Sequence, residues 1–372
     1  MEGPRATSKE EFKEVINLIN DVFRISGNHK PTMKEEFPLL LNEDNSDNMR
    51  IILDEGRPVS AVNYLREDIF IEGSKIKAAS IGAVCTAAEY RGNGYSSLIL
   101  DDVERKMKEE HVDIVLISGT RSLYTRRNCI MLQNFYKCMS YPKQDETIEL
   151  LEYDEKYLKN MMELYNRQST RYYRSFDDFN ALIMSATIPW GDFSYKKYVI
   201  VKNGEFVGYI VLRIIDGNSK YGQVIESLGD KNMINAALKS LAFELGVESI
   251  QSYIHVNEKH ADSFDSKKLD YLEGTLKIIN FVSLMENLRS YFLQYVPNSI
   301  GENIVFIEDE GRYIIKLKDE ILEIDNLEKI TKLVFEGKKD GITGIDDVQS
   351  IEMFIDRVFP IPFVWTANLN YQ

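Results

Sequence analysis

The sequence has little cysteine and little histidine, and neither residue type is spaced as metal ligands are. The three cysteines, Cys85, Cys129 and Cys138, follow no metal-binding pattern. The four histidines are scattered, and the nearest two, His255 and His260, stand five residues apart. We therefore expect no metal site. The odd number of cysteines fits a reducing compartment such as the cytoplasm.

Positive charge is also scarce. The chain has 45 lysine and arginine residues against 59 aspartate and glutamate residues, which gives a formal net charge of −14. A surface that binds nucleic acid needs a basic excess, so nucleic acid is not an expected partner. An acidic field of this kind instead attracts cationic small molecules.

Long apolar runs are missing as well. No segment approaches the ~20 apolar residues of a membrane span, and the first residues contain no apolar core typical of a signal peptide. What is present is a globular composition, with 44% hydrophobic and 11% aromatic residues among 372. That length has room for two or three domains with cores of their own.

The first part of the chain, to about residue 145, alternates strand and helix signals. Ser8 and Glu11 form a capping-box signature before an apolar-periodic helix. Strand-like runs then meet at turns over residues 54–56 and 72–74. A further strand is predicted over residues 112–119.

The second part, roughly residues 150–275, repeats this order. Ile200 aligns with Ile52, Gly204 with Gly56, and Val207 with Val59, each pair 148 residues apart. A strand, a helix and a second strand follow in both copies. The sequence therefore predicts an internal duplication.

The third part, about residues 276–372, predicts a helix over 282–295, three strands and two further helices. It ends in FPIPFVWTANLNYQ. The prolines and aromatic residues of this segment favour an extended tail that docks on the protein.

The segment EYRGNGYSSL, residues 89–98, joins a predicted strand to a predicted helix. Backbone N–H groups at such a junction can hold phosphate, because the start of a helix is its positive end. The glycines also imitate a dinucleotide-binding fingerprint, but that motif requires a preceding βαβ unit with parallel strands. Here hairpins precede it. The corresponding junction of the second copy, ESLGDKNMI, has one glycine and no arginine, which indicates that the copy has lost the phosphate site.

This segment resembles the phosphate loop of the Gcn5-related N-acetyltransferase (GNAT) superfamily, Arg/Gln-x-x-Gly-x-Gly/Ala. Arg91, Gly94 and Ser96 occupy its positions, and Ser96 replaces the usual glycine or alanine. The resemblance implies that the loop binds the pyrophosphate of acetyl-coenzyme A and that strand residues Val84, Cys85 and Thr86 pair with its pantetheine. The loop residues so implicated are Arg91, Gly92, Asn93, Gly94, Tyr95 and Ser96.

Over its full length the chain resembles the enhanced-intracellular-survival acetyltransferases. These join an active GNAT domain, a degenerate GNAT domain and a domain similar to sterol carrier protein 2. The resemblance implies an α/β (α+β) fold of tandem GNAT units, each a mixed β-sheet flanked by helices, plus an α+β domain. The corresponding ranges are residues 1–147, 148–275 and 276–372, and the resemblance also leaves room for a homo-oligomer.

The same resemblance suggests two catalytic residues. Tyr124 and Arg126 match the family's Tyr-x-Arg-x-Gly-Tyr stretch, although Asn128 and Cys129 replace its last two residues. Tyr124 would assist departure of the thiolate, as a proton donor or as a hydrogen-bond donor. The C-terminal carboxylate of Gln372 would handle the proton of the amine, unless the tail is only packing. Glu67, Asp68 and Glu72 either face a cationic substrate or belong to a solvated turn.

We therefore expect an acetyl-CoA-dependent N-acetyltransferase. Its partner would be a primary amine of a small, cationic molecule. Nucleic acid and membranes are not expected partners, for the reasons given above. Two alternatives remain open at this point. One is a non-catalytic module that binds coenzyme A or an apolar ligand, and the other is an enzyme that uses a longer acyl donor.

Overall fold

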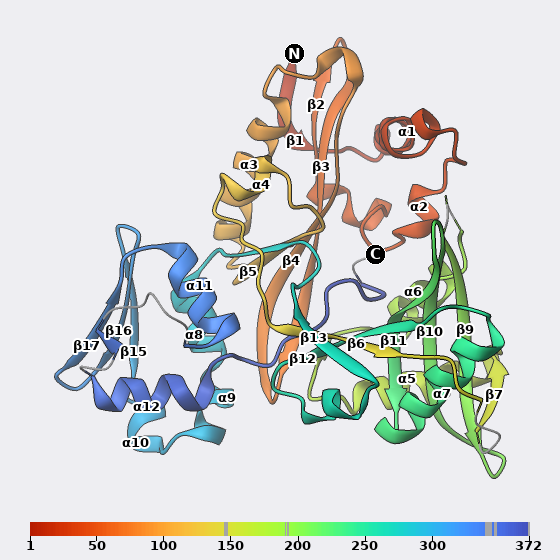
Figure 1. The fold of residues 1–372 in the computed structure, drawn as a ribbon. Coiled ribbons are helices and arrows are strands. Elements are labelled where there is room, and N and C mark those ends of the chain that lie inside the picture. The colour runs from red at the N-terminus through yellow and green to blue at the C-terminus, as the bar shows by residue number, and fades with distance from the viewer. Residues whose placement is uncertain (145–147, 190, 192, 339–343, 346–347, 371–372) are drawn as a thin grey trace.

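The computed structural model describes residues 1–372 except 145–147, 190, 192, 339–343, 346–347 and 371–372. Within the described ranges the strands form two seven-stranded sheets and one three-stranded sheet. Each sheet carries helices and belongs to one of three units (Figure 1). The first unit lies between the other two (Figure 1).

The first sheet has the strand order β1-β2-β3-β4-β5-β14, with β8 also paired to β3. Its neighbours are antiparallel except β4 and β5, which run parallel. The long pair β3–β4 forms the centre of this unit (Figure 1). The strands are β1 (Glu2–Ala6), β2 (Met49–Asp54), β3 (Arg57–Ile71), β4 (Ser74–Thr86), β5 (Ile114–Ile117), β8 (Thr170–Tyr172) and β14 (Thr275–Ile278).

Helices cover both faces of this sheet. Helix α1 (Phe12–Phe23) packs on the face that carries Ile51 and Ala61. Helix α3 (Tyr95–Glu109) packs on the face that carries their chain neighbours Ile52 and Val62, because successive side chains of a strand point to opposite faces. The start of α3 at Tyr95 confirms the helix expected after the glycine turn. Two short helices complete the unit, α2 (Met33–Glu36) and α4 (Ser122–Thr125).

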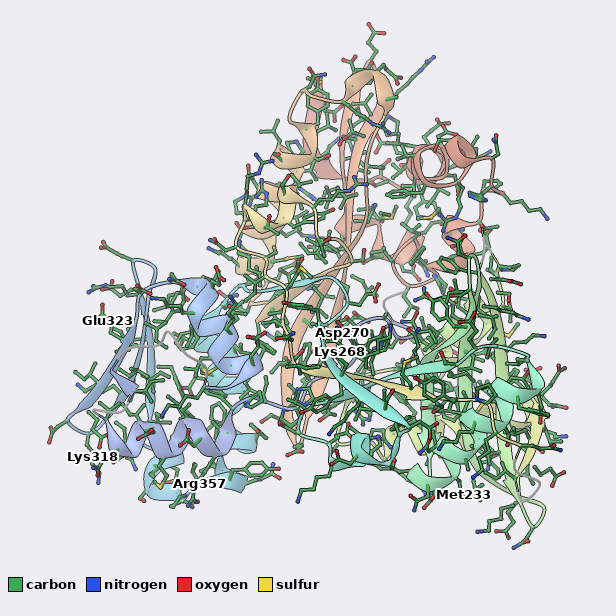
Figure 2. The ribbon with its side chains drawn as sticks, viewed as in Figure 1. Met233, Lys268, Asp270, Lys318, Glu323 and Arg357 are labelled. Atoms are coloured by element: carbon green, nitrogen blue, oxygen red, sulfur yellow. The ribbon has the colours of Figure 1, made fainter. Side chains whose placement is uncertain are left out.

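The second sheet has the strand order β13-β6-β12-β11-β10-β9-β7. Strand β13, which carries the labelled Lys268 and Asp270, is one edge of this sheet (Figure 2). The strands are β6 (Phe135–Ser140), β7 (Glu149–Glu152), β9 (Phe193–Lys202), β10 (Glu205–Asp216), β11 (Lys220–Gly229), β12 (Ile250–His255) and β13 (Ser266–Asp270). Its helices are α5 (Leu158–Asn166), α6 (Phe176–Ser185) and α7 (Lys231–Glu244).

The internal duplication is visible in matching hairpin turns. Glu55 and Gly56 join β2 to β3 with φ of 48° and 78°, and Asn203 and Gly204 join β9 to β10 with φ of 53° and 81°. Both residues of each turn have a left-handed backbone conformation, as a type I′ hairpin turn requires. The alignment by 148 residues therefore pairs structurally equivalent positions.

In its described residues, the third unit consists of the small sheet β15-β16-β17 and five helices. Lys318 and Glu323 mark its sheet and Arg357 its last helix (Figure 2). The helix expected over 282–295 is two helices, because the backbone leaves helical geometry at Leu288 (φ −85°, ψ −2°). The elements are α8 (Phe281–Asn287), α9 (Arg289–Tyr295), α10 (Asn298–Gly301), β15 (Val305–Asp309), β16 (Arg312–Leu317), β17 (Glu320–Ile324), α11 (Leu327–Glu336) and α12 (Gln349–Val358).

Strands cross between the units. β6 precedes residue 147 yet pairs with β12 and β13 in the second sheet. β8 and β14 come later in the chain yet pair with β3 and β5 in the first sheet. The expected ranges 1–147, 148–275 and 276–372 thus do not coincide with the strand membership of the sheets.

The tail after α12 returns to the junction of the first two units (Figure 1). Trp365 stacks on Tyr253 of β12, with ring centroids 3.9 Å apart and planes at 4°. Leu369 is buried among residues of α5 and α6. The expectation of a docked tail is confirmed for the described residues. No helix within the described part of the chain is long and apolar enough to cross a membrane.

Candidate active site

The loop between β4 and α3 has the geometry of an anion cradle. Gly92 and Gly94 have φ of 87° and 79°, and Gly94 is the N-cap of α3. An added Cβ at either glycine would meet no atom within 4 Å, so it is the left-handed backbone that calls for glycine. Among the described residues, no acceptor faces the backbone N–H groups of residues 92–96. Five donors at a helix start are a suitable site for phosphate.

Hydroxyl groups hold this loop against the sheet. The Thr86 and Ser96 hydroxyls lie 2.8 Å apart, and those of Thr86 and Ser60 also lie 2.8 Å apart. The Tyr90 hydroxyl donates to Asp54 Oδ2 at 2.9 Å. Ser96, the departure from the usual Gly or Ala, therefore has a structural partner at the end of β4.

Strands β4 and β5 separate next to this loop. They pair from Ala78↔Ile114 to Ile81↔Ile117 only, whereas β4 continues to Thr86. Residues 82–86 therefore present one backbone edge that no described strand covers. An extended amide chain such as pantetheine can add to an edge of this kind as a further strand. Val84, Cys85 and Thr86 contribute backbone here, and the buried Cys85 thiol faces the α1 side with its pKa raised to about 12 by burial.

A bulge interrupts β4 at the same place. The β3–β4 register shifts between Ala61↔Cys85 and Asn63↔Gly82, and Ala83 has a φ of 49°. The Asn63 amide donates to the Ala83 carbonyl at 3.0 Å. Because the C=O and N–H of a trans peptide point in opposite directions, this bond also fixes the direction of the Val84 N–H. Sequence reasoning did not identify Asn63.

Tyr124 lies at the other side of the opening. It is 7% exposed in α4, and its ring lies against Gly119, where an added Cβ would approach Tyr124 Cε2 to 2.6 Å. Burial raises the pKa of Tyr124 above its ordinary value, and the nearby Arg121 opposes this shift. A tyrosine with a raised pKa is a poor donor of a whole proton to a thiolate but still a good hydrogen-bond donor.

One cavity of about 670 Å³ joins these elements. It is lined by the loop, the end of β4 and the α4 region. Three exposed arginines, Arg91, Arg121 and Arg126, border it, and their charge suits the phosphates of a coenzyme A ester. Of these, Arg121 was not identified from sequence. Tyr136, the other tyrosine that could be mistaken for Tyr124, lies in β6 of the second sheet.

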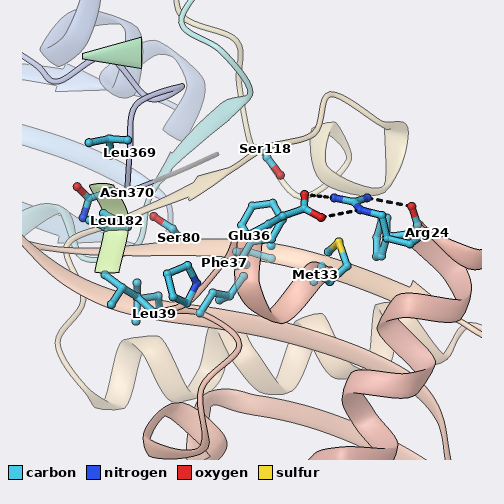
Figure 3. A pocket seen from close by; sticks show the side chains of 17 residues that line it. Arg24, Met33, Glu36, Phe37, Leu39, Ser80, Ser118, Leu182, Leu369 and Asn370 are labelled. Carbon is cyan, nitrogen blue, oxygen red and sulfur yellow. Dashed lines mark hydrogen bonds and ion pairs between the residues drawn. The ribbon is translucent and has the colours of Figure 1, made fainter. Parts of the chain in front are cut away.

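A second cavity of about 230 Å³ opens on the α1–α2 side of β4 (Figure 3). Its walls are mostly apolar, with Met33, Phe37 and Leu39 from the first unit and Leu182 from the second (Figure 3). At one end Arg24 Nε donates to Glu36 Oε1 at 2.9 Å within a buried ion pair. Ser80 and Asn370 line the same cavity (Figure 3).

A third, more polar cavity of about 680 Å³ adjoins this one, and Leu39, Leu65 and Asn370 line both. It contains Glu67 and Asp68, two of the three acidic residues considered for a cationic substrate. Asp68 pairs with Lys75 at 3.0 Å. Glu72 instead contacts α9, where its side chain accepts from the Tyr295 hydroxyl. The structure thus brings Glu67 and Asp68 to a cavity and leaves Glu72 at the contact with the third unit.

The end of the chain reaches these cavities. Asn370 is bonded to both Arg174 and Glu67, at 2.7 and 2.6 Å. Gln372, whose carboxylate was expected to act on the amine, lies outside the described residues. Its catalytic role stays a prediction.

The second unit has a cavity at the corresponding place, but the chain's own tail lines it. β11 and β12 pair only at Gly222↔Ile250 and Gln223↔Gln251 and then separate. The cavity beside them is lined partly by the tail, through Phe363, Val364 and Trp365. The duplicate therefore keeps the fold, while aromatic and apolar side chains of the tail border the cavity beside its separating strands.

Comparisons with known proteins agree with this description. Residues 4–130 match the family model described as "Acetyltransferase (GNAT) domain". No curated protein matches the sequence. Among solved structures, a GCN5-related N-acetyltransferase from Anabaena variabilis ATCC 29413 is 14% identical, with 99% of both chains covered and a TM-score of 0.64. A GCN5-related N-acetyltransferase from Kribbella flavida is 11% identical, covering 99% of this chain and 97% of that chain, with a TM-score of 0.62.

Residues 4–130 are therefore similar to a GNAT domain, and the whole chain has the fold of these solved GNAT structures. Over the full chain, the fold is also that of Eis1 from Mycobacterium abscessus, at 10% identity and a TM-score of 0.59, with 97% of this chain and 96% of that chain covered. At such identities the likeness shows the fold alone. The similarity of residues 276–372 to sterol carrier protein 2 stays a prediction.

Proposed function

We propose that the protein transfers the acetyl group of acetyl-CoA to a primary amine by direct attack. The observation that carries this proposal is the convergence of three features on one cavity. These are the N–H cradle of residues 92–96, the uncovered edge of β4 and the hydroxyl of Tyr124. Together they suit the pyrophosphate, the pantetheine and the thioester of one extended ligand.

The reaction follows from this placement. The amine nitrogen attacks the thioester carbon, and backbone N–H groups at the β4 bulge polarise the carbonyl oxygen. The C–S bond breaks, and the Tyr124 hydroxyl donates a hydrogen bond to the departing sulfur. Because its pKa is raised, Tyr124 acts mainly by stabilising the thiolate rather than by giving up its proton.

The acceptor enters from the opposite side of β4. The cavity with Met33, Phe37 and Leu182 accommodates an apolar body, and the net charge of −14 attracts a cationic amine. The Gln372 carboxylate is our candidate to receive the proton that nitrogen loses once the C–N bond has formed. A small-molecule amine in the cytoplasm fits these features.

Release of free thiol tests this function. The full chain is incubated with acetyl-CoA and a panel of alkyl, arylalkyl and polycationic amines, and thiol is measured with and without each amine. We expect amine-dependent release that Arg91→Glu weakens through coenzyme affinity. Binding of acetyl-CoA with no release for any amine would favour a non-catalytic module. Faster release from longer acyl thioesters would favour a different donor.

A further inference from the structure

Glu67 occupies an unusual position between the two acceptor-side cavities. Its side chain lines the polar cavity of about 680 Å³. Its Oε2 accepts from the Ser80 hydroxyl at 2.8 Å, and Ser80 lines the apolar cavity of about 230 Å³. The Glu67–Ser80 hydrogen bond therefore connects the two cavities through the wall between them.

Strand register places this pair on the same face of the sheet as Asn63, next to the bulge of β4. Leu65 pairs with Ser80, and Asn63 pairs with Gly82. Because side chains two residues apart share a face, Glu67, Ser80 and Asn63 lie on one face of the sheet. Ser80 is three residues before the bulge at Ala83, about 10 Å along the strand. An amine that approaches the bulge from this cavity passes the Ser80 hydroxyl.

The second unit and the tail hold Glu67 in place. Asn370 Nδ2 donates to Glu67 Oε1 at 2.6 Å, and Asn370 Oδ1 accepts from Arg174 Nε at 2.7 Å. Arg174 is 2% exposed and pairs with Glu226 of β11 at 2.8 Å. Glu226 also accepts from the Tyr209 hydroxyl at 2.7 Å. The Glu67 carboxylate is thus part of a network of hydrogen bonds and an ion pair that extends into the second sheet.

The surroundings make Glu67 a better base than an ordinary carboxylate. Desolvation raises its pKa to about 7, although the bonds from Asn370 and Ser80 and the charge of Arg174 act in the opposite direction, while Asp178 of α6 adds to the rise. A carboxylate of ordinary pKa lies much further below an alkylammonium near 10. Other charged groups around the same polar cavity are Asp44, Arg66, Asp68, Lys75, Lys77 and Glu110.

We propose that Glu67 receives, through the Ser80 hydroxyl, the proton that the acceptor ammonium must lose before it attacks. The proposal rests on the proposed function and adds a residue to it. An N–H bond of the ammonium breaks as an O–H bond forms on Ser80, while the original Ser80 proton moves to Glu67. The neutral amine then attacks, and Glu67 returns its proton to solvent through the polar cavity. The second nitrogen proton leaves after C–N bond formation, and the thiolate is finally protonated to thiol.

The experiment measures kcat/KM against pH for the full chain with acetyl-CoA and the best amine of the panel. Wild type needs ionised Glu67, so activity should rise as pH increases through about 7. Glu67→Gln should lower kcat/KM by about 10²-fold and abolish the rise of kcat/KM with pH near 7. Ser80→Ala should have a similar effect, and Ser80→Thr should restore activity because it keeps the hydroxyl.

Glu328→Gln is the matched control, because Glu328 is an exposed carboxylate of α11 in the third unit that pairs with Lys332. It should keep the wild-type profile. Calorimetric affinity for acetyl-CoA and the melting temperature identify any variant that fails through misfolding. If a folded Glu67→Gln chain keeps the wild-type kcat/KM and its rise with pH, this proposal is overturned. The proposed function would remain intact. A wild-type chain that acetylates no amine overturns both.

Discussion

The position of the Tyr124 ring depends on the residues packed against it. Gly119 leaves room for the ring, and the Thr275 hydroxyl of β14 donates to the Gly119 carbonyl at 3.0 Å. The tyrosine is therefore held by Gly119, which follows β5, and indirectly by Thr275 of β14, which lies far from it in the chain. Tyr124 lines the cavity, and no side chain in the described ranges is hydrogen-bonded to its hydroxyl.

Removing only this hydroxyl should separate chemistry from binding. We expect Tyr124→Phe to lower kcat by about 10²-fold, the range of a general acid or strong hydrogen-bond donor. Affinity for acetyl-CoA, measured by calorimetry, should persist. Tyr136→Phe serves as the control because Tyr136 belongs to the second sheet. If Tyr136→Phe were the damaging change, the assignment of the tyrosine would be wrong.

Glu67 also predicts a dependence of stability on pH. Its pKa rises from 4.5 to about 7 on folding, so the native state binds the proton more tightly than the unfolded chain. This contribution is fully present below about 4.5 and is lost as pH rises through about 7. Relative to Glu67→Gln, wild type should lose up to about 3 kcal/mol of unfolding free energy between these limits. Urea titrations at pH 4.5, 6 and 8 measure this difference, and a constant difference would contradict the shift.

At the scale of elements, the phosphate loop combines a strand end, a turn and a helix start. The hydroxyls of Ser60, Thr86 and Ser96 link these parts. The second unit has the helix start, α7, with Asp230 as its N-cap accepting from the N–H groups of Asn232 and Met233. A side-chain carboxylate thus occupies donors that the first unit leaves available for a ligand.

Changes in the loop should weaken coenzyme binding. Arg91→Glu puts a carboxylate beside the expected phosphates, and Gly94→Val forces a branched residue into a φ of 79° at the helix start. Both should raise the Kd for acetyl-CoA at least about tenfold, as expected when a charge-assisted contact is lost. Calorimetry measures this value.

Matched controls come from the second unit. Gly204→Val meets the same backbone strain, with a φ of 81° and open space around the glycine. Lys231→Glu inverts an exposed charge at the start of α7. Neither should change coenzyme affinity. Unchanged affinity in both loop variants would mean that the coenzyme binds elsewhere.

At the scale of the whole molecule, the tail joins all three units. It leaves α12 in the third unit, stacks Trp365 on the second sheet, and brings Asn370 to Glu67 of the first. The tail therefore contributes Asn370 to the acceptor-side part of the candidate site.

The proposed role of the terminal carboxylate can be tested by changing its position. A short Gly-Ser extension after Gln372 displaces the terminal carboxylate, so turnover should fall by about 10²-fold while acetyl-CoA affinity is kept. Gln372→Ala keeps the carboxylate and should be mild. Deleting residues 370–372 should be more damaging than the extension, because it also removes the Asn370 bonds. Wild-type turnover in the extended chain would show that the terminus only packs.

Much of the fold was predictable because its signals are local. The glycine turn, the start of α3 at Tyr95 and the paired hairpin turns at Gly56 and Gly204 each depend on neighbouring residues and their allowed φ values. The docked tail was predictable from its prolines and aromatic residues. The loop residues Arg91 to Ser96 were likewise identified from a contiguous motif.

Tertiary structure alone decided which strands share a sheet and which polar groups meet. Nothing in the sequence of β6 or β14 distinguishes one sheet edge from another, since backbone hydrogen bonds are the same at every edge. Glu67 and Asn370 are 303 residues apart, and Arg174 and Asn370 are 196 apart. Contacts at such separations depend on packing of the three units and leave no pattern along the chain. Local sequence signals therefore predicted a coenzyme loop, whereas the proposed proton path became visible only in the tertiary structure.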